Sequence, residues 1–99
     1  MEKINEIFVL AAELAIKDGA VPIEEMYERK LDDNWTIVIN GSKERKYKGL
    51  SIPPFCMYVE FDGLPAGLLD PWDGVIAAEK EANEDALIRA LKDALKEAE

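Results

Sequence analysis

Pairs of aspartate and glutamate are the residues of this sequence whose types and spacing could support chemistry. The close pairs are Asp32 with Asp33, Glu60 with Asp62, and Asp70 with Asp73. Paired carboxylates can act as general acid and base, or bind a divalent cation through their oxygens. A magnesium or calcium site needs more converging carboxylates, and EF-hand spacing is absent from the sequence. We therefore interpret the pairs as solvated carboxylates and expect neither a metal ion nor a cofactor.

Imidazole and thiol chemistry have little support, because the 99 residues include no histidine and one cysteine, Cys56. Without histidine, the chain has no side chain with an ordinary pKa near neutrality and no imidazole ligand for zinc. Cys56 has no histidine to activate it, so we interpret it as a semi-buried strand residue. Motifs for phosphate-binding glycine loops and nucleophile elbows are also absent. The sequence therefore predicts a protein that is not an enzyme.

Acidic residues outnumber basic residues by 21 to 12, which gives a net charge of -9. Such a surface repels nucleic-acid phosphates and attracts basic protein surfaces. The charge is unevenly distributed. Residues 1–33 carry nine acids and four bases, 34–59 carry one and four, and 60–99 carry eleven and four. This distribution favours an oriented docking surface over a uniform imitation of DNA.

One segment of the chain, residues 41–49, is basic. It contains Lys43, Arg45, Lys46 and Lys48 beside Glu44 and Tyr47. The segment could contact a phosphate backbone or an acidic protein, with Tyr47 offering a stacking face. Four bases in a field of -9 would bind nucleic acid weakly and lose that binding in salt. We favour a solvated hairpin tip, with the four bases as a secondary contact.

Amphipathic helices are predicted at both ends of the chain. Residues 2–18 place apolar side chains on one stripe, and Gly19 supplies the C-terminal stop. The last helix begins at Asn83, a favourable N-cap, and buries a stripe of leucine, isoleucine and alanine. Residues 22–31 fit either a short helix or a strand that pairs across the turn at 32–34, and we favour the helix.

The middle of the chain predicts strands, and these span 35–40, 55–62 and 64–69. Asp62 and Gly63 form the dipeptide preferred in a type I′ hairpin turn. That turn pairs Phe61 with Leu64, Glu60 with Pro65, Val59 with Ala66, and Met57 with Leu68. Because Pro65 has no N–H to donate, we expect 64–69 to be an edge strand. The open face of the sheet would carry Thr36, Val38, Cys56, Tyr58, Glu60 and Pro65.

The stretch from Asp70 to Gly74 has the composition of a turn and contains Trp72. Tryptophan is a frequent hot-spot residue of protein interfaces. Trp72 would either contact a partner or fold back over the end of the sheet, and the sequence leaves both interpretations open.

The predicted fold is α+β: a single domain, 1–99, with a three-stranded antiparallel meander and N- and C-terminal helices on one face. This α-β-β-β-α order is that of double-stranded-RNA-binding domains. Those domains need a basic start to the final helix, which lies across phosphates. Residues 79–85 are net negative here, so we expect no RNA binding through that helix.

In its general profile the chain resembles the short acidic inhibitors that phages and mobile elements make against bacterial defence systems, above all anti-CRISPR proteins. The resemblance rests on size, on absent catalytic residues, on acid-rich stretches such as 24–25 and 32–33, and on the block 53–67. It implies binding to the basic nucleic-acid channel of a CRISPR effector, in part by imitating the charge of DNA. The basic segment departs from this pattern, because a DNA mimic would not turn it toward its target.

These observations predict a non-enzymatic inhibitor that occludes a basic nucleic-acid-binding surface of a CRISPR-type defence complex. Its partner-binding residues would be Asp32, Asp33, Glu60, Asp62, Asp70, Trp72 and Asp73. One alternative is a homo-oligomeric assembly protein of a phage or bacterium, paired through the 64–69 edge or the open sheet face. A second is a weak nucleic-acid binder that uses residues 43–48.

The expected partner is a protein with a basic surface, bound by a monomer or homodimer. The first residues lack the basic start and apolar run of a signal peptide, and no apolar stretch reaches the length of a membrane span. We therefore expect no membrane association and a cytoplasmic location, which would be the host cytoplasm for a phage-encoded protein.

Overall fold

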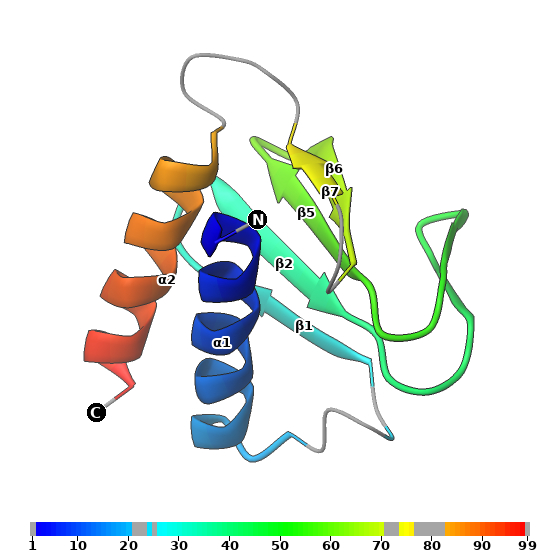
Figure 1. Ribbon diagram of the computed structural model, residues 1–99, viewed down its shortest axis with the longest axis horizontal. Helices are drawn as coiled ribbons and strands as arrows, with labels where there is room; N and C mark the ends of the chain where they lie inside the picture. The colour runs from blue at the N-terminus through cyan, green and yellow to red at the C-terminus, as the bar shows by residue number, and fades with distance from the viewer. Residues whose placement is uncertain (1, 21–23, 25, 71–73, 77–82, 99) are drawn as a thin grey trace.

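Two helices pack on one face of a five-stranded antiparallel sheet in the computed structural model, which describes residues 2–20, 24, 26–70, 74–76 and 83–98 (Figure 1). The helices are α1 (Glu2–Lys17) and α2 (Glu84–Glu97). The sheet has the order β1-β2-β5-β6-β7. Its strands are β1 (Tyr27–Lys30), β2 (Trp35–Ile39), β5 (Met57–Phe61), β6 (Leu64–Leu69) and β7 (Gly74–Ile76). The α+β class and the helix–strands–helix order are confirmed, but the sheet has more strands than predicted.

The ends of both helices follow local sequence signals. Gly19 adopts a positive φ of 78° after α1, and the N–H of Ala20 donates to the carbonyl of Ala15 at 2.9 Å. A residue with positive φ, followed by an N–H that bonds the carbonyl five residues back, is a common way for a helix to end. At α2, the side chain of Asn83 accepts a hydrogen bond from the N–H of Ala86 at 2.9 Å. Both predicted boundary residues are confirmed.

The prediction of a short helix within 22–31 is wrong for its second half, because Tyr27–Lys30 is strand β1. It pairs with β2 in the register Tyr27 with Ile39 and Lys30 with Thr36. Tyr27 turns into the core, whereas Glu28 and Lys30 are exposed. The pairing across 32–34 supplies a hydrophobic partner strand, and this outweighs the weak helical spacing.

The β5–β6 hairpin has the predicted turn but not the predicted register throughout. Asp62 and Gly63 have φ of 54° and 79°, as a type I′ turn requires. Phe61 pairs with Leu64 and Glu60 with Pro65, as predicted. Ala66 is then an extra residue, so the partners of Val59 and Met57 are Gly67 and Leu69. This bulge turns both Ala66 and Leu69 toward the helices, where they are buried.

Strand β6 is not an edge strand, because β7 pairs with it on the side away from β5. The pairs are Gly67 with Ile76, Leu68 with Val75, and Leu69 with Gly74. Pro65 is tolerated because the pairing with β7 begins at Gly67, beyond the residue that lacks an N–H. The predicted free edge along 64–69 is therefore wrong, because β7 occupies its Gly67–Leu69 part.

A separate hairpin of β3 (Arg45–Tyr47) and β4 (Leu50–Ile52) covers the sheet face that was expected to be open. Its turn consists of Lys48 and Gly49, whose φ values of 50° and 80° are positive. Under the hairpin lies a second apolar cluster of Val38, Ile52, Cys56 and Tyr58. Phe55 adopts a φ of 61° before β5 and is half exposed, so the predicted start of that strand at 55 is wrong.

The main core fills the space between the helices and the other sheet face. It contains the predicted stripes of both helices together with Trp35, Ile37, Met57 and Val59. No described helix combines the length and the apolar character that crossing a membrane would require.

Candidate functional site

Two turns meet at one end of the sheet, the β1–β2 turn at 31–34 and the β5–β6 turn at 62–63. The side-chain amide of Asn34 donates to Asp62 Oδ1 at 2.6 Å, and the Asp62 N–H donates to the Asn34 carbonyl at 2.8 Å. Asp32 shapes its own turn, because its Oδ1 accepts the N–H groups of Asn34 and Trp35 at 2.8 and 2.7 Å. Asp32, Asp33 and Asp62 are all exposed at this end. The predicted acids of these two turns are therefore brought together.

A cleft of about 630 Å³ separates these turns from α2. It is lined by Asp32, Asn34, Trp35, Phe61, Asn83, Asp85, Ala86, Arg89, Ala90 and Asp93. The aromatic part of its lining is an edge-to-face pair, with the rings of Trp35 and Phe61 centred 4.9 Å apart at 64°. Trp35 is only 3% exposed, so the polar rim and not the indole is available to a ligand.

The α2 wall of the cleft carries Asp85, Arg89 and Asp93 at a spacing of four, which puts them on one side of the helix. Asp85 forms an ion pair with Lys3 of α1 at 3.1 Å, and this hydrogen bond raises the pKa of Lys3. Arg89 and Asp93 form no ion pair or hydrogen bond with any described residue. Carboxylates thus outnumber cations around the cleft, which suits a cationic ligand group.

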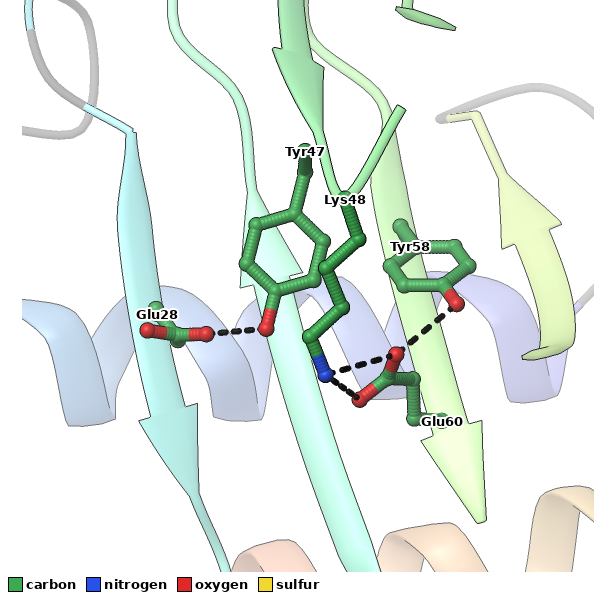
Figure 2. Close-up of polar contacts among 5 residues, drawn as sticks. All are labelled: Glu28, Tyr47, Lys48, Tyr58 and Glu60. Carbon is green, nitrogen blue, oxygen red and sulfur yellow. Dashed lines mark hydrogen bonds and ion pairs between the residues drawn. The ribbon is translucent and has the colours of Figure 1, made fainter. Parts of the chain in front are cut away.

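Glu60 is not part of this acidic end, contrary to the prediction that it shares a surface with Asp62. It lies on the hairpin side of the sheet and is 4% exposed, too little to meet a partner. Lys48 Nζ lies 3.3 and 3.4 Å from its two carboxylate oxygens, and the Tyr58 hydroxyl donates to it at 3.0 Å (Figure 2). Burial, and next the hydrogen bond to Glu60, raise the pKa of Tyr58 to about 12.

A second carboxylate beneath the hairpin completes its attachment to the sheet. The hydroxyl of Tyr47 on β3 donates to Glu28 on β1, and this bond is the main cause of the raised pKa of Tyr47 (Figure 2). The rings of Tyr47 and Tyr58 pack 5.7 Å apart. We call Glu28, Tyr47, Lys48, Tyr58 and Glu60 the hairpin clamp.

The remaining predicted acids lie elsewhere. Asp70 follows β6 at the end opposite Asp62 and is half-buried. Burial, and then the charge of Asp70, raise the pKa of the Cys56 thiol. Trp72 and Asp73 lie outside the described residues. The described members of the predicted partner-binding set are therefore divided between the two ends of the sheet and, for Glu60, its hairpin side.

The four bases of the basic segment are also divided. Lys48 is in the hairpin clamp, and a guanidinium nitrogen of Arg45 donates to the Glu24 carbonyl at 2.9 Å. Lys43 and Lys46 are exposed. Part of the predicted secondary contact thus attaches the hairpin to the rest of the protein.

Asn40 is a structural residue that the sequence-based prediction missed. It is 1% exposed, and its amide nitrogen lies 2.7, 2.8 and 3.1 Å from the carbonyl oxygens of Lys43, Ile52 and Pro53. Its side-chain oxygen accepts the Gly41 N–H at 2.9 Å. The asparagine–glycine pair directly after a strand was the available signal, because it is typical of a turn.

Among the described residues, no three acidic or thiol side chains are placed to share a metal ion. Comparison with protein-family models, with curated proteins and with solved structures finds no match to this chain. The function of this chain is therefore inferred from the residues around the cleft.

Proposed function

We propose that this chain is a non-enzymatic protein-binding domain that uses its acidic cleft to bind a basic surface of another protein. The observation that carries the proposal is the position of Asp32 across the cleft from Asp85 and Asp93 of α2, on a turn that is joined to the turn of the exposed Asp62. Such carboxylates attract lysine and arginine side chains and accept their hydrogen bonds.

The proposed mechanism is occlusion. Surfaces that bind nucleic acid are rich in lysine and arginine, because these residues neutralise phosphates. A protein with a net charge of -9 that docks through its acidic cleft would cover such a surface and compete with the nucleic acid. Inhibition of a nucleic-acid-binding complex is therefore the activity we assign to the cleft. Arg89 forms no ion pair with a described residue. Its charge would repel the lysine and arginine side chains of the partner from that part of the cleft and so fix the orientation of docking.

The test uses two charge reversals with the same change in net charge. Asp93→Lys alters the cleft, and Glu13→Lys alters an exposed residue in the C-terminal half of α1. The probe is a fluorescent peptide, RKGRKGRK, with EDGEDGED as the negative control. We expect Asp93→Lys to weaken binding by about tenfold and Glu13→Lys by less than about twofold, because a contacting charge outweighs a distant one in salt.

Salt dependence is the second measurement. The dissociation constant of the wild-type complex should rise steeply as ionic strength increases, since exposed charges are screened beyond a Debye length of about 8 Å at physiological salt. Affinity that does not depend on salt, or equal losses in the two variants, would contradict the proposal.

A further inference from the structure

An apolar groove of about 290 Å³ runs between β4 and β6, on the side of the sheet away from the helices. It is lined by Leu50, Ser51, Ile52, Tyr58, Pro65, Gly67 and Leu68. None of these side chains carries a charge at neutral pH. Leu50 and Leu68 are 42% and 45% exposed, whereas Ile52 and Tyr58 are nearly covered. The groove therefore has exposed apolar walls and a packed floor.

The groove exists because the hairpin is fastened toward β1 and β5 but not toward β6. The hairpin clamp joins Tyr47 to Glu28 on β1, and Lys48 to Glu60 on β5. Within the described residues, no hydrogen bond or ion pair joins β4 to β6. Two exposed leucines in a groove with well-packed surroundings are the arrangement that protein interfaces use for an apolar anchor.

The backbone of β4 offers a second recognition feature. In the described structure, β4 pairs with β3 and with no other strand. The groove is lined by residues of β4 and by none of β3, so β3 does not separate β4 from it. An unpaired strand edge binds an extended segment by main-chain hydrogen bonds, and pockets beside it select side chains.

The charge around the groove selects the kind of segment. Residues 34–59 carry four bases and one acid, but Glu28 and Glu60 also lie beneath the hairpin, where Lys48 and Arg45 are engaged. Lys43 and Lys46 are exposed on the hairpin. Acidic residues on either side of an apolar anchor would therefore be attracted to this surface and repelled by the rest of the molecule.

We propose that the groove binds an extended acidic segment of a partner protein. The segment would add as a strand to β4 and place an apolar side chain between Leu50 and Leu68. At about 290 Å³ the groove is at the small end of ligand pockets, a size that suits one or two side chains. The groove and the acidic cleft share no lining residue, so this binding is independent of the function proposed for the cleft.

The test measures binding of the fluorescent peptide EDSLFSDE by anisotropy. KKSLFSKK keeps the apolar centre and reverses the charge, and EDSASSDE keeps the charge and removes the anchor. A version of EDSLFSDE with N-methylated central amides removes main-chain donors. We expect each of the three altered peptides to bind at least about tenfold more weakly than EDSLFSDE, because each lacks one of the features proposed for recognition. If any one of these three peptides binds as tightly as EDSLFSDE, the proposal is wrong.

Matched variants locate the binding. Leu68→Glu alters the groove, and Ile16→Glu makes the same change at a residue of α1 that is 68% exposed. We expect Leu68→Glu to weaken binding of EDSLFSDE by about tenfold and Ile16→Glu to leave it within about twofold. Lys46→Glu, compared with Lys30→Glu on β1, supplies a second pair of exposed residues if Leu68→Glu fails to fold. Equal losses within the pair used would overturn the assignment to the groove.

A second copy of this chain is the competing occupant. Sedimentation velocity of the wild-type protein should show a monomer whose size does not depend on concentration. A dimer that Leu68→Glu disperses would show that a second copy covers the groove, and the proposal would be wrong. If the protein binds EDSLFSDE but not RKGRKGRK, the function proposed for the cleft is wrong and the proposal for the groove stands.

Discussion

Asn34 and Asp62 join the two turns at the acidic end of the sheet by two hydrogen bonds. One runs from the Asn34 side-chain amide to Asp62 Oδ1, and the other from the Asp62 N–H to the Asn34 carbonyl. The first bond uses a carboxylate oxygen, so it fixes the position of Asp62 and leaves its charge in place. The spacing of the acids beside the cleft therefore depends on an uncharged residue.

We expect Asn34→Ala to weaken binding of the basic peptide although the net charge is unchanged. The loss of an exposed bond should lower the free energy of unfolding by about 1 kcal/mol. Urea unfolding and anisotropy measure the two effects. Asn5→Ala, at an exposed residue of α1, is the control. We expect it to lower neither the affinity for the basic peptide nor the free energy of unfolding. Unchanged peptide affinity in Asn34→Ala would show that the joined turns do not shape the binding site.

The ion pair of the hairpin clamp can be isolated by a double-mutant cycle. Lys48→Ala leaves the nearly buried carboxylate of Glu60 without its cation, whereas the same change combined with Glu60→Gln does not. We expect Lys48→Ala to be more destabilising alone than in the Glu60→Gln protein. The coupling should be about 1 kcal/mol or less, because Lys48 remains largely solvated. Thermal or urea unfolding of the four proteins gives this coupling, and a value of zero would show that the pair is held by packing alone.

Asn40 should be the most sensitive polar residue of the hairpin. Asn40→Ala removes the side chain that contacts both ends of the hairpin and leaves buried carbonyls without a donor. We expect a loss of about 2–3 kcal/mol in the free energy of unfolding, measured by urea titration.

Cys56 reports the same change locally, because it lies in the apolar cluster under the hairpin. Burial raises its pKa in the native protein, so alkylation of the thiol should be slow. Alkylation should accelerate in Asn40→Ala at urea concentrations where the helices remain folded. If the thiol reacts no faster than in the wild-type protein, Asn40 does not hold the hairpin over the sheet.

All three tyrosines donate a hydrogen bond to a carboxylate: Tyr27 to Asp18, Tyr47 to Glu28, and Tyr58 to Glu60. Each has a raised pKa, mainly from burial at Tyr27 and Tyr58 and from the hydrogen bond at Tyr47. An unfolded chain gives up these protons near pH 10, whereas native Tyr58 keeps its proton until about pH 12. The unfolded state then binds fewer protons, so the free energy of unfolding should fall as pH rises from about 10 to 12.

Tyrosinate absorbance provides the measurement. In the native protein the tyrosines should ionise late and together with unfolding, and Tyr58→Phe should reduce the dependence of stability on pH in this range. Ordinary ionisation near pH 10 with the fold intact would contradict the three hydrogen bonds.

The helices could be predicted from sequence because their signals are local. Gly19 and Asn83 mark ends that depend on a few neighbouring residues, and the structure confirms both. At β1 the local signals do not decide between the helix and the strand that 22–31 both fit, since its four residues are mostly charged and become a strand through pairing with β2. The extra residue Ala66 was equally hidden, because a bulge follows from competition between the two faces of a sheet.

The cleft was beyond sequence reasoning for a different reason. Its acids come from two turns and from α2, and only the packing of α2 beside Trp35 and Phe61 brings them together. Asp85 and Asp93 read in sequence as ordinary solvated residues of a helix. Glu60 was predicted to be exposed, and its alternation with Phe61 predicted the correct face of the sheet. It is buried because the β3–β4 hairpin, which comes from another segment of the chain, covers this face.

The β3–β4 hairpin leaves and rejoins the sheet at adjacent positions, because the Asn40 N–H bonds the Cys56 carbonyl at 2.9 Å and Ile39 pairs with Met57. The meander would remain continuous if residues 41–55 were replaced by a tight turn. This segment is therefore an insertion between two ladder positions that pair directly with each other, and it buries Val38, Cys56 and Tyr58 beneath it. The partner proposed for the groove would therefore be selected in part by this insertion, whereas the helices and the acidic cleft belong to the rest of the chain.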